Sequence, residues 1–450
     1  MMTTEPEQIR RAIDSLTAQG VDVVRIVHPD LPGRARGKDI LLPHLPEAAT
    51  HGVAFCRAAT YHAGTRGEVS DLPEGRRAGM PDIVVHPNLD TLAPLPWEPG
   101  VAWCIGDALE PGTGLPASES PRHLIQHVTG HLTACGLTAV VGPELEYVLL
   151  ERDPASPHGW RRYAAMSGNL YAAGRSGDLD GHLLQTMRYL HAAGISATGG
   201  NREYAGGQFE INLAHSEALY AADQAFLFKS AVREIACLQG KLATFMAKPF
   251  NDGAGSGFHL HISMYDDDQH NVFDDTNQPN GLSATARHSI SGVLKHAPAL
   301  TALCNPTVNS YKRLSANSAA PWLIDWGLDN RCAMVRIPPQ RGNATRIELR
   351  LPDASANPYL ATAALIAAIR LGIDKPAEPP ARLNGYGYDP SKAARLPTNL
   401  AAALDALEAD HELTETLGKA FIDTFLHLKR NELERYQQYV TDWEFREYAR

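Results

Sequence analysis

Four short stretches decide the fold of this chain, and they read VGPELEYVLL (141–150), NREYAGGQFEINL (201–213), GSGFHLHISM (255–264) and ATRIELRLPD (344–353). In the first stretch Glu144 and Glu146 are two positions apart, so both side chains point to the same face of a β-strand. The other stretches carry further charged residues among apolar ones: Glu203 and Glu210 around a Gly-Gly pair, His259 with His261, and Arg346 with Glu348 and Arg350. A single pair of this kind more often marks an ordinary solvated sheet face or two unremarkable histidines. Four such stretches in one chain instead predict strands whose charged faces line a polar cavity.

The flanking segments predict an α+β fold with two domains. Helical spacing runs from Pro6 to Gln19, residues 21–30 alternate like a strand, and residues 37–43 are expected to pair back on that strand. A stretch rich in Gly, Pro and Ser at 110–121 marks the domain boundary. We therefore expect two units, a small N-terminal domain at 1–112 and a large C-terminal domain at 113–450.

Later and intervening segments complete this expectation. Residues 64–87 are rich in Gly, Arg, Asp and Pro and predict a long loop, whereas NPYLATAALIAAIRLGI (357–373) predicts an apolar helix. The tail from 400 to 450 is predicted to be helical with many charges.

The composition excludes several classes of protein. A formal net charge of −10, without a stripe of Lys and Arg, argues against a nucleic-acid partner. No run approaches the roughly 18 apolar residues of a membrane span, and the first residues have no apolar core typical of a signal peptide. The six cysteines are widely spaced without a Cys-X-X-Cys pair, which favours free thiols in a reducing compartment. We expect a cytoplasmic protein without a membrane partner.

The crowding of acidic residues predicts a metal site. Five carboxylates belong to the predicted cavity, and they are Glu144, Glu146, Glu203, Glu210 and Glu348. They would repel one another strongly unless cations lay among them, and two divalent ions offset four of the five charges. Oxygen ligands with a single imidazole suit Mg²⁺ or Mn²⁺ better than zinc.

A set of arginines then requires anionic partners, and its members are Arg313, Arg331, Arg336, Arg346 and Arg350. Phosphates and a substrate carboxylate match the guanidinium fork. Metals bound by carboxylates beside arginines point to phosphoryl transfer from a nucleotide. Since no GxxxxGK[ST] motif is present, the nucleotide is not held by a P-loop.

Six motifs resemble the glutamine synthetase family in their order and spacing: GPELEY, NREYAGGQFEINL, GSGFHLH, NPTVNSYKRL, DNRCAMVRIP and RIELRLPDASANPYL. The resemblance runs from Pro121 to Tyr359, and the N-terminal segment looks more loosely like that family's β-grasp domain. It implies a large catalytic domain whose curved antiparallel sheet lines the active site with helices outside. It further implies a dodecamer of two hexameric rings, with active sites between neighbouring subunits.

The resemblance also implies a role for each site residue. One divalent ion is held by Glu146, Glu203 and Glu210, and another by Glu144, His259 and Glu348. The carboxylates of glutamate are bound by Arg313 and Arg350, and the backbone of Gly255 lies near its amino group. The transferring phosphate is faced by Arg331 and Arg336, and the ATP site is lined by His261, Ser263 and Arg346. The implied reaction forms γ-glutamyl phosphate from glutamate and ATP, and an amine then displaces phosphate.

The sequence departs from the family pattern where ammonium should bind. FCRAATYHAGTRGEVSDLP (55–73) lacks the family's DGSS-like motif, whose Asp binds ammonium. The flap, defined here as Ala316–Pro321, has Ala319 where the family motif PGYEAP has its Glu, and Ala254 replaces an Asn. An ammonium ion without an anionic partner costs several kcal/mol to desolvate. We therefore expect the acceptor to be an organic amine.

The expected acceptor is a polyamine, ethanolamine or an alkylamine, as in the γ-glutamylpolyamine and γ-glutamylethanolamide synthetases that this chain resembles in general plan. A polyamine would need acidic or aromatic side chains along its path, and the candidates are Tyr61, Glu68 and Asp71, all of which are equally explained as solvated loop residues. A short amine would need only a small polar pocket, formed by Asn317 and Ser318.

Three other functions stay open at this point. The first is ordinary glutamine synthesis with substitute acids from the longer loop. The second is a catalytically silent homologue, which the full set of mutually repelling ligands disfavours. The third is a metal-dependent amide hydrolase, which the phosphate-facing arginines disfavour.

Overall fold

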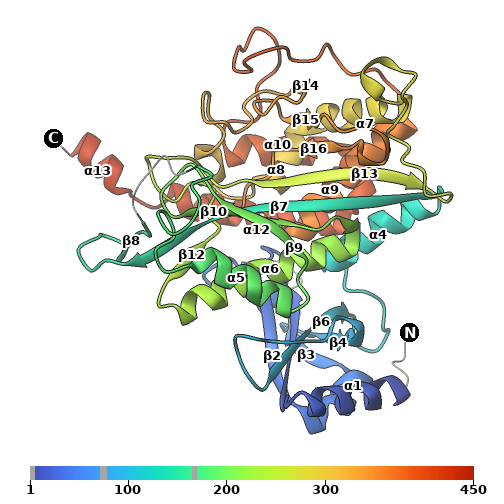
Figure 1. Cartoon of the computed structure of the whole chain (residues 1–450), viewed down its shortest axis with the longest axis vertical. Coiled ribbons are helices and arrows are strands. Elements are labelled where there is room, and N and C mark those ends of the chain that lie inside the picture. Colours follow the sequence, from blue (N-terminus) through green and yellow to red (C-terminus); the bar gives the residue numbers. More distant parts are fainter. Residues whose placement is uncertain (1–5, 71–78, 165–169, 450) are drawn as a thin grey trace.

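The computed structural model describes residues 6–70, 79–164 and 170–449. Its helices are α1 (Pro6–Ala18), α2 (Leu45–His51), α3 (Arg57–Tyr61), α4 (Pro121–Thr133), α5 (His182–Ala192), α6 (Ala218–Leu238), α7 (Ala284–Lys295), α8 (Ala297–Cys304), α9 (Pro358–Asp374), α10 (Leu400–Ala409), α11 (His411–Leu417), α12 (Lys419–Gln437) and α13 (Asp442–Tyr448). Figure 1 shows a small unit that carries α1 below a larger unit built around two long strands. The α+β class is confirmed.

The small unit is a mixed sheet with the strand order β2-β1-β6-β4-β3. Its strands are β1 (Val23–Pro29), β2 (Ala35–Leu41), β3 (Val53–Cys56), β4 (Asp82–Pro87), β5 (Ala93–Pro94) and β6 (Val101–Leu109). The predicted hairpin is confirmed, because β1 and β2 pair antiparallel, while β1 and β6 run parallel. The prediction of a loop through residue 87 was wrong at its end. Ile83 and Val85 of β4 alternate with less buried residues, and they are buried in the core of this unit.

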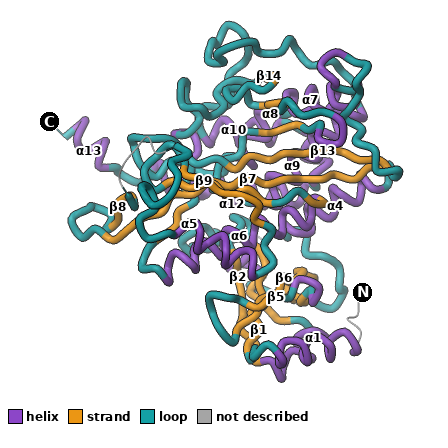
Figure 2. The backbone as a smooth tube through the Cα atoms, in the orientation of Figure 1, coloured by secondary structure: helices purple, strands orange, loops and turns teal. Residues whose placement is uncertain are grey.

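The large unit is a second sheet with the strand order β14-β15-β16-β13-β7-β10-β9. Its strands are β7 (Leu137–Arg152), β8 (Trp160–Arg162), β9 (Ala197–Arg202), β10 (Gln208–Leu213), β11 (Ser216–Glu217), β12 (Leu242–Thr244), β13 (Phe258–Asp266), β14 (Trp326–Leu328), β15 (Val335–Ile337) and β16 (Ile347–Leu349). The pairs are antiparallel as expected, except that β14 and β15 at one edge run parallel. Figure 2 shows β7 and β13 crossing the whole unit side by side.

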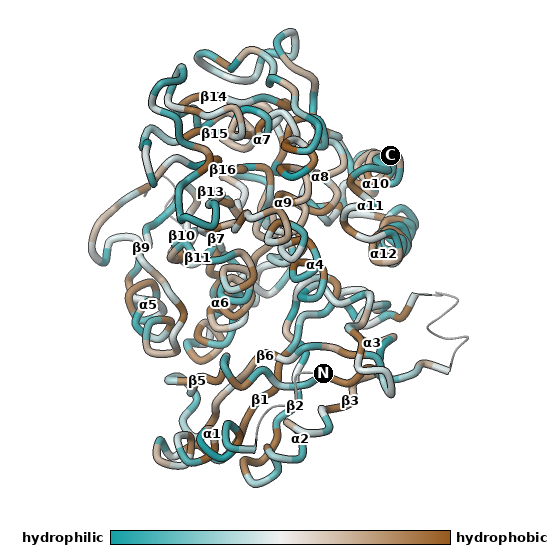
Figure 3. The backbone as a smooth tube through the Cα atoms, turned by 90° about the vertical axis from the view of Figure 1, so that its right-hand side faces the viewer, coloured by the Kyte–Doolittle hydropathy of each residue, from teal (hydrophilic) through white to brown (hydrophobic). Residues whose placement is uncertain are grey.

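One face of this sheet is covered by helices. Leu145, Tyr147 and Leu149 of β7 are buried on that face, where the ring of Tyr147 packs against Phe228 of α6. Behind them lies α9, which is buried on nearly all sides as its uniformly apolar sequence predicts. In Figure 3 the outer helix α1 instead alternates between hydrophilic and hydrophobic residues. The opposite face of the sheet is therefore left for the charged side chains of the same strands.

Arg122 anchors two helices of the large unit to each other and also contacts the small unit. Arg122 at the start of α4 donates to both carboxylate oxygens of Asp223 in α6, at 2.9 Å each, and also to Asp107 of β6. Tyr359 of α9 donates to the same Asp223 at 2.7 Å. The expected boundary at 112/113 lies between β6 and α4, and the division at that residue stays a prediction. Among the described helices, none is long and apolar enough to cross a membrane.

Substituting Arg122→Ala should destabilise the protein by about 3–5 kcal/mol, because it leaves the buried Asp223 carboxylate without a cation. Thermal and urea unfolding measure this loss. The matched control is Arg430→Ala, which removes an arginine from the exposed partners Asp405 and Glu408 and should cost no more than about 1 kcal/mol. Equal losses for the two variants would contradict the assignment of a stabilising buried ion pair to Arg122 and Asp223.

Candidate functional site

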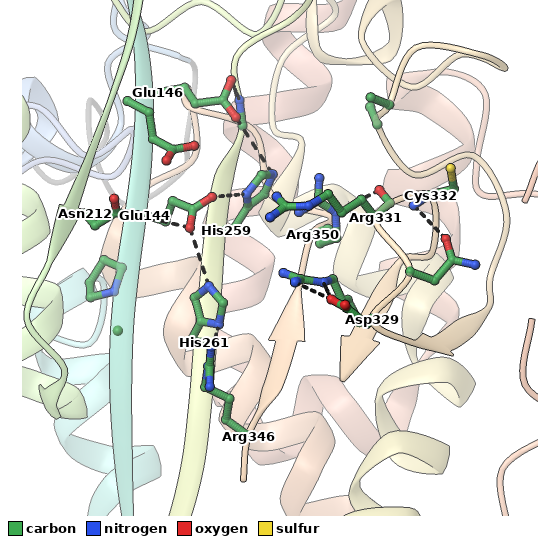
Figure 4. Close-up of a pocket in the computed structure, with 18 of the residues that line it drawn as sticks. Glu144, Glu146, Asn212, His259, His261, Asp329, Arg331, Cys332, Arg346 and Arg350 are labelled. Carbon is green, nitrogen blue, oxygen red and sulfur yellow. Dashed lines mark hydrogen bonds and ion pairs between the residues drawn. The ribbon is translucent and has the colours of Figure 1, made fainter. Parts of the chain in front are cut away.

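The charged face of the large sheet forms one wall of a cavity of about 1670 Å³. Loops complete its lining, among them the flap and residues 329–332 and 385–388. Figure 4 shows the labelled glutamates of β7 beside the histidines of β13, and those histidines beside Arg346 and Arg350 at the two ends of the neighbouring strand β16. The polar cavity predicted from residue spacing is therefore present.

Strand register brings the predicted metal ligands together. In the antiparallel pairs, Glu210 of β10 lies opposite Glu146 of β7, and His259 of β13 lies opposite Glu144. The next pair across the sheet is His261 opposite Glu348 of β16. Opposed residues have Cβ atoms about 4.5–5.5 Å apart, so the register alone is sufficient to gather these side chains.

Glu144, His259 and Glu348 form a group that fits a divalent cation. One ligand atom from each lies within 4.8 Å of the others. His259 donates from Nδ1 to Glu144 at 2.8 Å, and Glu348 accepts from Arg336 and Arg350 at 2.6 Å each. Two carboxylates and one imidazole suit a hard cation such as Mg²⁺ or Mn²⁺. These three residues are the predicted ligands of the second ion.

Glu146, Glu203 and Glu210 form the more acidic half of the site. Burial and the charge of Glu146 raise the pKa of Glu203 to about 7. Burial and the charges of Glu144, Glu146 and Glu203 raise the pKa of Glu210 well above its usual range. The carboxylates are thus close enough that the negative charge of each one favours protonation of its neighbours. A divalent cation would relieve the same repulsion, so the charge of this group suits the predicted first ion. Among the described residues, only Glu144, His259 and Glu348 bring ligand atoms within 4.8 Å of one another, and the first ion stays a prediction.

The other two carboxylates are held as anions. Burial raises the pKa of Glu144, but hydrogen bonds from His259 and His261 outweigh it and leave that pKa well below its usual range. Burial likewise opposes ionisation of Glu348, yet the charges of Arg350, of both histidines and of Arg336 lower its pKa to about 2. The site is therefore acidic on one side and neutralised on the other.

The predicted arginines surround the acidic group. Arg313 is buried and donates to the carbonyl oxygens of Leu351 and Arg350 at 3.0 and 3.2 Å. Arg350 donates from Nε to the carbonyl oxygen of Arg331 at 3.1 Å, which holds the exposed Arg331 at the cavity wall. These contacts fix the guanidinium groups of Arg313 and Arg350 and the backbone of Arg331 at one end of the cavity.

The residues expected around ATP line the same cavity, farther along β13 from the glutamates. Arg346 donates from Nε to Nδ1 of His261 at 3.1 Å, and Ser263 donates to the carbonyl oxygen of Thr345 at 2.9 Å. The carbonyl oxygen of Gly255 accepts from Gln208 at 3.0 Å. All of the predicted site residues line the cavity except Glu348, which lies directly behind it and bonds to two lining arginines.

Several lining residues were missed by the sequence analysis. Gln208 donates to Glu146 at 2.8 Å and Asn212 to Glu144 at 3.1 Å. Both are two positions from Glu210 on the same strand and so point to the same face, and this spacing could have identified them from the sequence. Asp329, in the left-handed region at φ 44°, accepts from Arg336 at 2.6 Å, and no local signal predicted this contact.

The residues expected near the amine divide into two groups. Ala254, Asn317, Ser318 and Ala319 line the cavity. Tyr61 instead is fully buried in the core of the N-terminal unit, and Glu68 pairs with Arg435 at 3.1 Å. The structure does not bring those two side chains to this cavity, which corrects the idea that they flank a polyamine within the chain. Asp71 lies outside the described residues.

Comparisons with known proteins agree with this geometry. The model of the family described as glutamine synthetase, catalytic domain, matches residues 118–448. The glutamine synthetase of Halobacterium salinarum is 35% identical over 451 residues, covering 97% of this chain and 95% of that protein. The glutamate–methylamine ligase of Methyloversatilis universalis is 36% identical over 439 residues, covering 93% and 94%. A solved GmaS–ADP complex superposes with a TM-score of 0.85 at 32% identity, covering 97% and 99%.

Gly257→Ala should weaken metal binding at least tenfold. A Cβ atom there would lie 2.6 Å from Nε2 of His259 and 3.0 Å from Oε1 of Glu146, so a ligand would have to move. Titration with Mn²⁺ by calorimetry measures the change. The control Gly130→Ala places a methyl group on α4 where no atom lies within 4 Å, and it should bind Mn²⁺ like the wild type. Unchanged affinity in Gly257→Ala would refute the assigned ligands.

The increase in melting temperature caused by Mg²⁺ should be larger at pH 8 than at pH 6. In the folded metal-free protein, Glu203 and Glu210 keep protons that the unfolded chain releases above about pH 4.5. The metal-free protein therefore loses stability as the pH rises through 7. Mg²⁺ replaces those protons and meets less competition at higher pH. Differential scanning fluorimetry checks this, and Glu203→Gln should shrink the difference between the two pH values. An equal or smaller Mg²⁺ effect at pH 8 would count against the carboxylate assignment.

Proposed function

Because the chain belongs to the glutamine synthetase family and is an ATP-dependent ligase of glutamate with ammonia or an amine, we propose that its acceptor is a small alkylamine such as methylamine. The observation that carries this proposal is the flap. Asn317, Ser318, Ala319 and Ala320 line the cavity, and none of these side chains is acidic. Ammonium and methylammonium carry the same charge, and neither finds an anionic partner in this segment when it loses its solvation there.

An alkyl group changes this balance. Each buried methylene or methyl group contributes about 0.8 kcal/mol, and the methyl groups of Ala319 and Ala320 offer it an apolar contact. Methylamine is therefore favoured over ammonium by contact rather than by charge. The printed activity of the Methyloversatilis universalis relative, ligation of glutamate and methylamine, supports the same choice.

A polyamine is less well supported than an alkylamine. Its second and third cationic groups would need anionic partners along the path. Neither of the two described loop residues considered for this purpose reaches the cavity of its own chain, because Tyr61 lies in the N-terminal core and Glu68 pairs with Arg435.

The remaining residues are assigned as in the family. Arg313 and Arg350 bind the carboxylates of glutamate, with Gly255 near its amino group, and Arg331 and Arg336 face the phosphate. His261, Ser263 and Arg346 contact ATP. Divalent ions, held by Glu146, Glu203 and Glu210 and by Glu144, His259 and Glu348, supply charge compensation for the phosphates. Amide hydrolysis is disfavoured, because the arginines then lack a phosphate to bind.

The proposed reaction has two steps. An oxygen of the γ-carboxylate of glutamate attacks the γ-phosphorus of ATP, ADP leaves, and γ-glutamyl phosphate forms. The amine nitrogen then attacks the acyl carbon, its proton is lost, and phosphate leaves with the C–O bond electrons. The arginines at the end of the cavity stabilise the charge that builds up on the phosphoryl oxygens. The dodecamer of two hexameric rings implied by the family stays a prediction, which mass photometry would test.

A panel of amines tests the acceptor. Pure protein is incubated with ATP, Mg²⁺ and glutamate, and both phosphate and γ-glutamyl amide are measured with ammonium, methylamine, ethylamine, ethanolamine, putrescine and spermidine. We expect kcat/KM for methylamine to exceed that for ammonium at least tenfold. Faster turnover with ammonium than with every organic amine would make this chain a glutamine synthetase in activity.

Substitution at the flap gives the matching variant. Ala319→Glu returns a carboxylate to the cavity and should raise kcat/KM for ammonium relative to methylamine by at least tenfold. Ala319→Gln has the same size without the charge, and it should lower methylamine use without improving ammonium use. Similar effects of Glu and Gln would show that size, not charge, decides the acceptor at this position.

A further inference from the structure

The flap is held in place by two tyrosines from a distant segment of the chain. Tyr386 donates from its hydroxyl to Oδ1 of Asn317 at 3.0 Å, and Tyr388 donates to the carbonyl oxygen of Ala320 at 3.2 Å. The two rings meet edge to face, with centroids 5.0 Å apart. Both tyrosines line the same cavity as the flap. Their hydrogen bonds therefore hold the flap near both of its ends.

The flap needs such a hold because its own backbone is unfavourable. Asn317 and Ala319 lie in the left-handed region at φ 63° and 59°. Alanine has no side-chain hydrogen bond to offset that conformation, and such residues persist only where their surroundings enforce it. Ser318 contributes from inside the flap, because its hydroxyl lies 2.5 Å from the carbonyl oxygen of Ser315 and 3.2 Å from that of Arg313. The flap is thereby linked to the backbone of the turn that carries Arg313, a residue assigned to glutamate.

The segment that carries the tyrosines is itself attached to the arginine end of the cavity. Asn330 donates from Nδ2 to the carbonyl oxygen of Gly385 at 2.8 Å, and Leu383 donates its amide to Trp326 at 2.7 Å. Tyr388 lies beside Cys332, which follows Arg331 in the turn at the arginine end of the cavity. One connected set of contacts thus joins the flap, the turn that carries Arg331, and Arg313.

We propose that Tyr386 and Tyr388 are positioning residues that keep the flap closed over the acyl phosphate, the task for which this chain has no acid at position 319. The inference rests on the proposed function, since it concerns the same intermediate. γ-Glutamyl phosphate has two fates in this cavity. Attack by the amine forms the C–N bond, breaks the C–O bond and releases phosphate, whereas attack by water returns glutamate and phosphate. A flap held in place favours the first outcome by excluding water.

The hydroxyl groups can be removed without disturbing the fold. Tyr386 is 65% exposed and Tyr388 is half-buried, so phenylalanine preserves the ring contact and loses the bonds to the flap, together with the contact between the Tyr388 hydroxyl and Cys332. A purely structural role would change stability or expression and would leave the ratio of products unchanged. The positioning role predicts a change in that ratio.

The double variant Tyr386→Phe/Tyr388→Phe tests this inference. We expect the share of phosphate released without γ-glutamyl amide to rise at least fivefold and KM for the amine to rise about fivefold to tenfold. KM for ATP should stay within twofold of the wild type. The control Tyr439→Phe alters an exposed tyrosine that does not line the cavity, and it should leave all of these values unchanged. If the double variant released the same share of phosphate without γ-glutamyl amide as the wild type, the proposal would be overturned.

A double-mutant cycle assigns the effect to the bond rather than to the ring. Asn317→Gly removes the acceptor of Tyr386 and relaxes the left-handed backbone. Adding Tyr386→Phe to it should therefore change little further the share of phosphate released without γ-glutamyl amide. Fully additive effects of the two substitutions would refute the assigned contact.

Hydrogen exchange separates this inference from the proposed function. Amide exchange of residues 315–323 should be at least fivefold faster in the double variant than in the wild type, whether or not any amine is a substrate. Unchanged exchange would overturn the positioning role while leaving the ligase activity intact. Faster exchange in a protein that makes no amide with any amine would support the hold on the flap and reject the proposed function.

Discussion

Glu144, Glu146 and Glu210 lie on paired strands in register, on the face of the sheet that the helices do not cover. In a partly desolvated cavity such like charges repel far more strongly than in water. The protein offsets this repulsion in three ways: by hydrogen bonds from His259 and His261, by arginines, and by protons retained on the most crowded carboxylates. Divalent cations are a fourth means of the same kind. The repulsion among the assembled acids is therefore the physical reason to expect a divalent cation at this site.

Glu348 shows how this charge balance connects metal and substrate. Arg336 and Arg350 both donate to it, and Arg350 also donates to the carbonyl oxygen of Arg331. The groups assigned to phosphate and glutamate are thus anchored through a residue assigned to the metal. Removing one charge from this network would displace the others, because each guanidinium is oriented by a carboxylate or carbonyl oxygen already in place.

The two sides of the cavity are built differently. The metal side comes from strands, whose register leaves its residues little freedom. The acceptor side comes from the flap and the segment around Tyr386 and Tyr388, whose backbone is held by a few side-chain bonds. Loops tolerate substitution more readily than paired strands. This difference explains how relatives with the same phosphoryl chemistry can differ in the amine they use, as the names of the Halobacterium salinarum and Methyloversatilis universalis proteins indicate.

The sequence by itself determined the fold class, the charged faces of β7, β13 and β16, and a set of five carboxylates whose mutual repulsion favours divalent cations. It did so because strand alternation is a local rule and because crowded like charges need cations among them. The same rule reaches Gln208 and Asn212. The assignment of individual ligands to two ions came from the resemblance to the glutamine synthetase family and stays a prediction. Tertiary structure alone decided which loops face the cavity. It buried Tyr61, paired Glu68 with Arg435, and brought Tyr386 and Tyr388 onto the flap. Contacts between irregular segments far apart in the chain follow no period, so they depend on how the whole core packs and cannot be deduced from neighbouring residues.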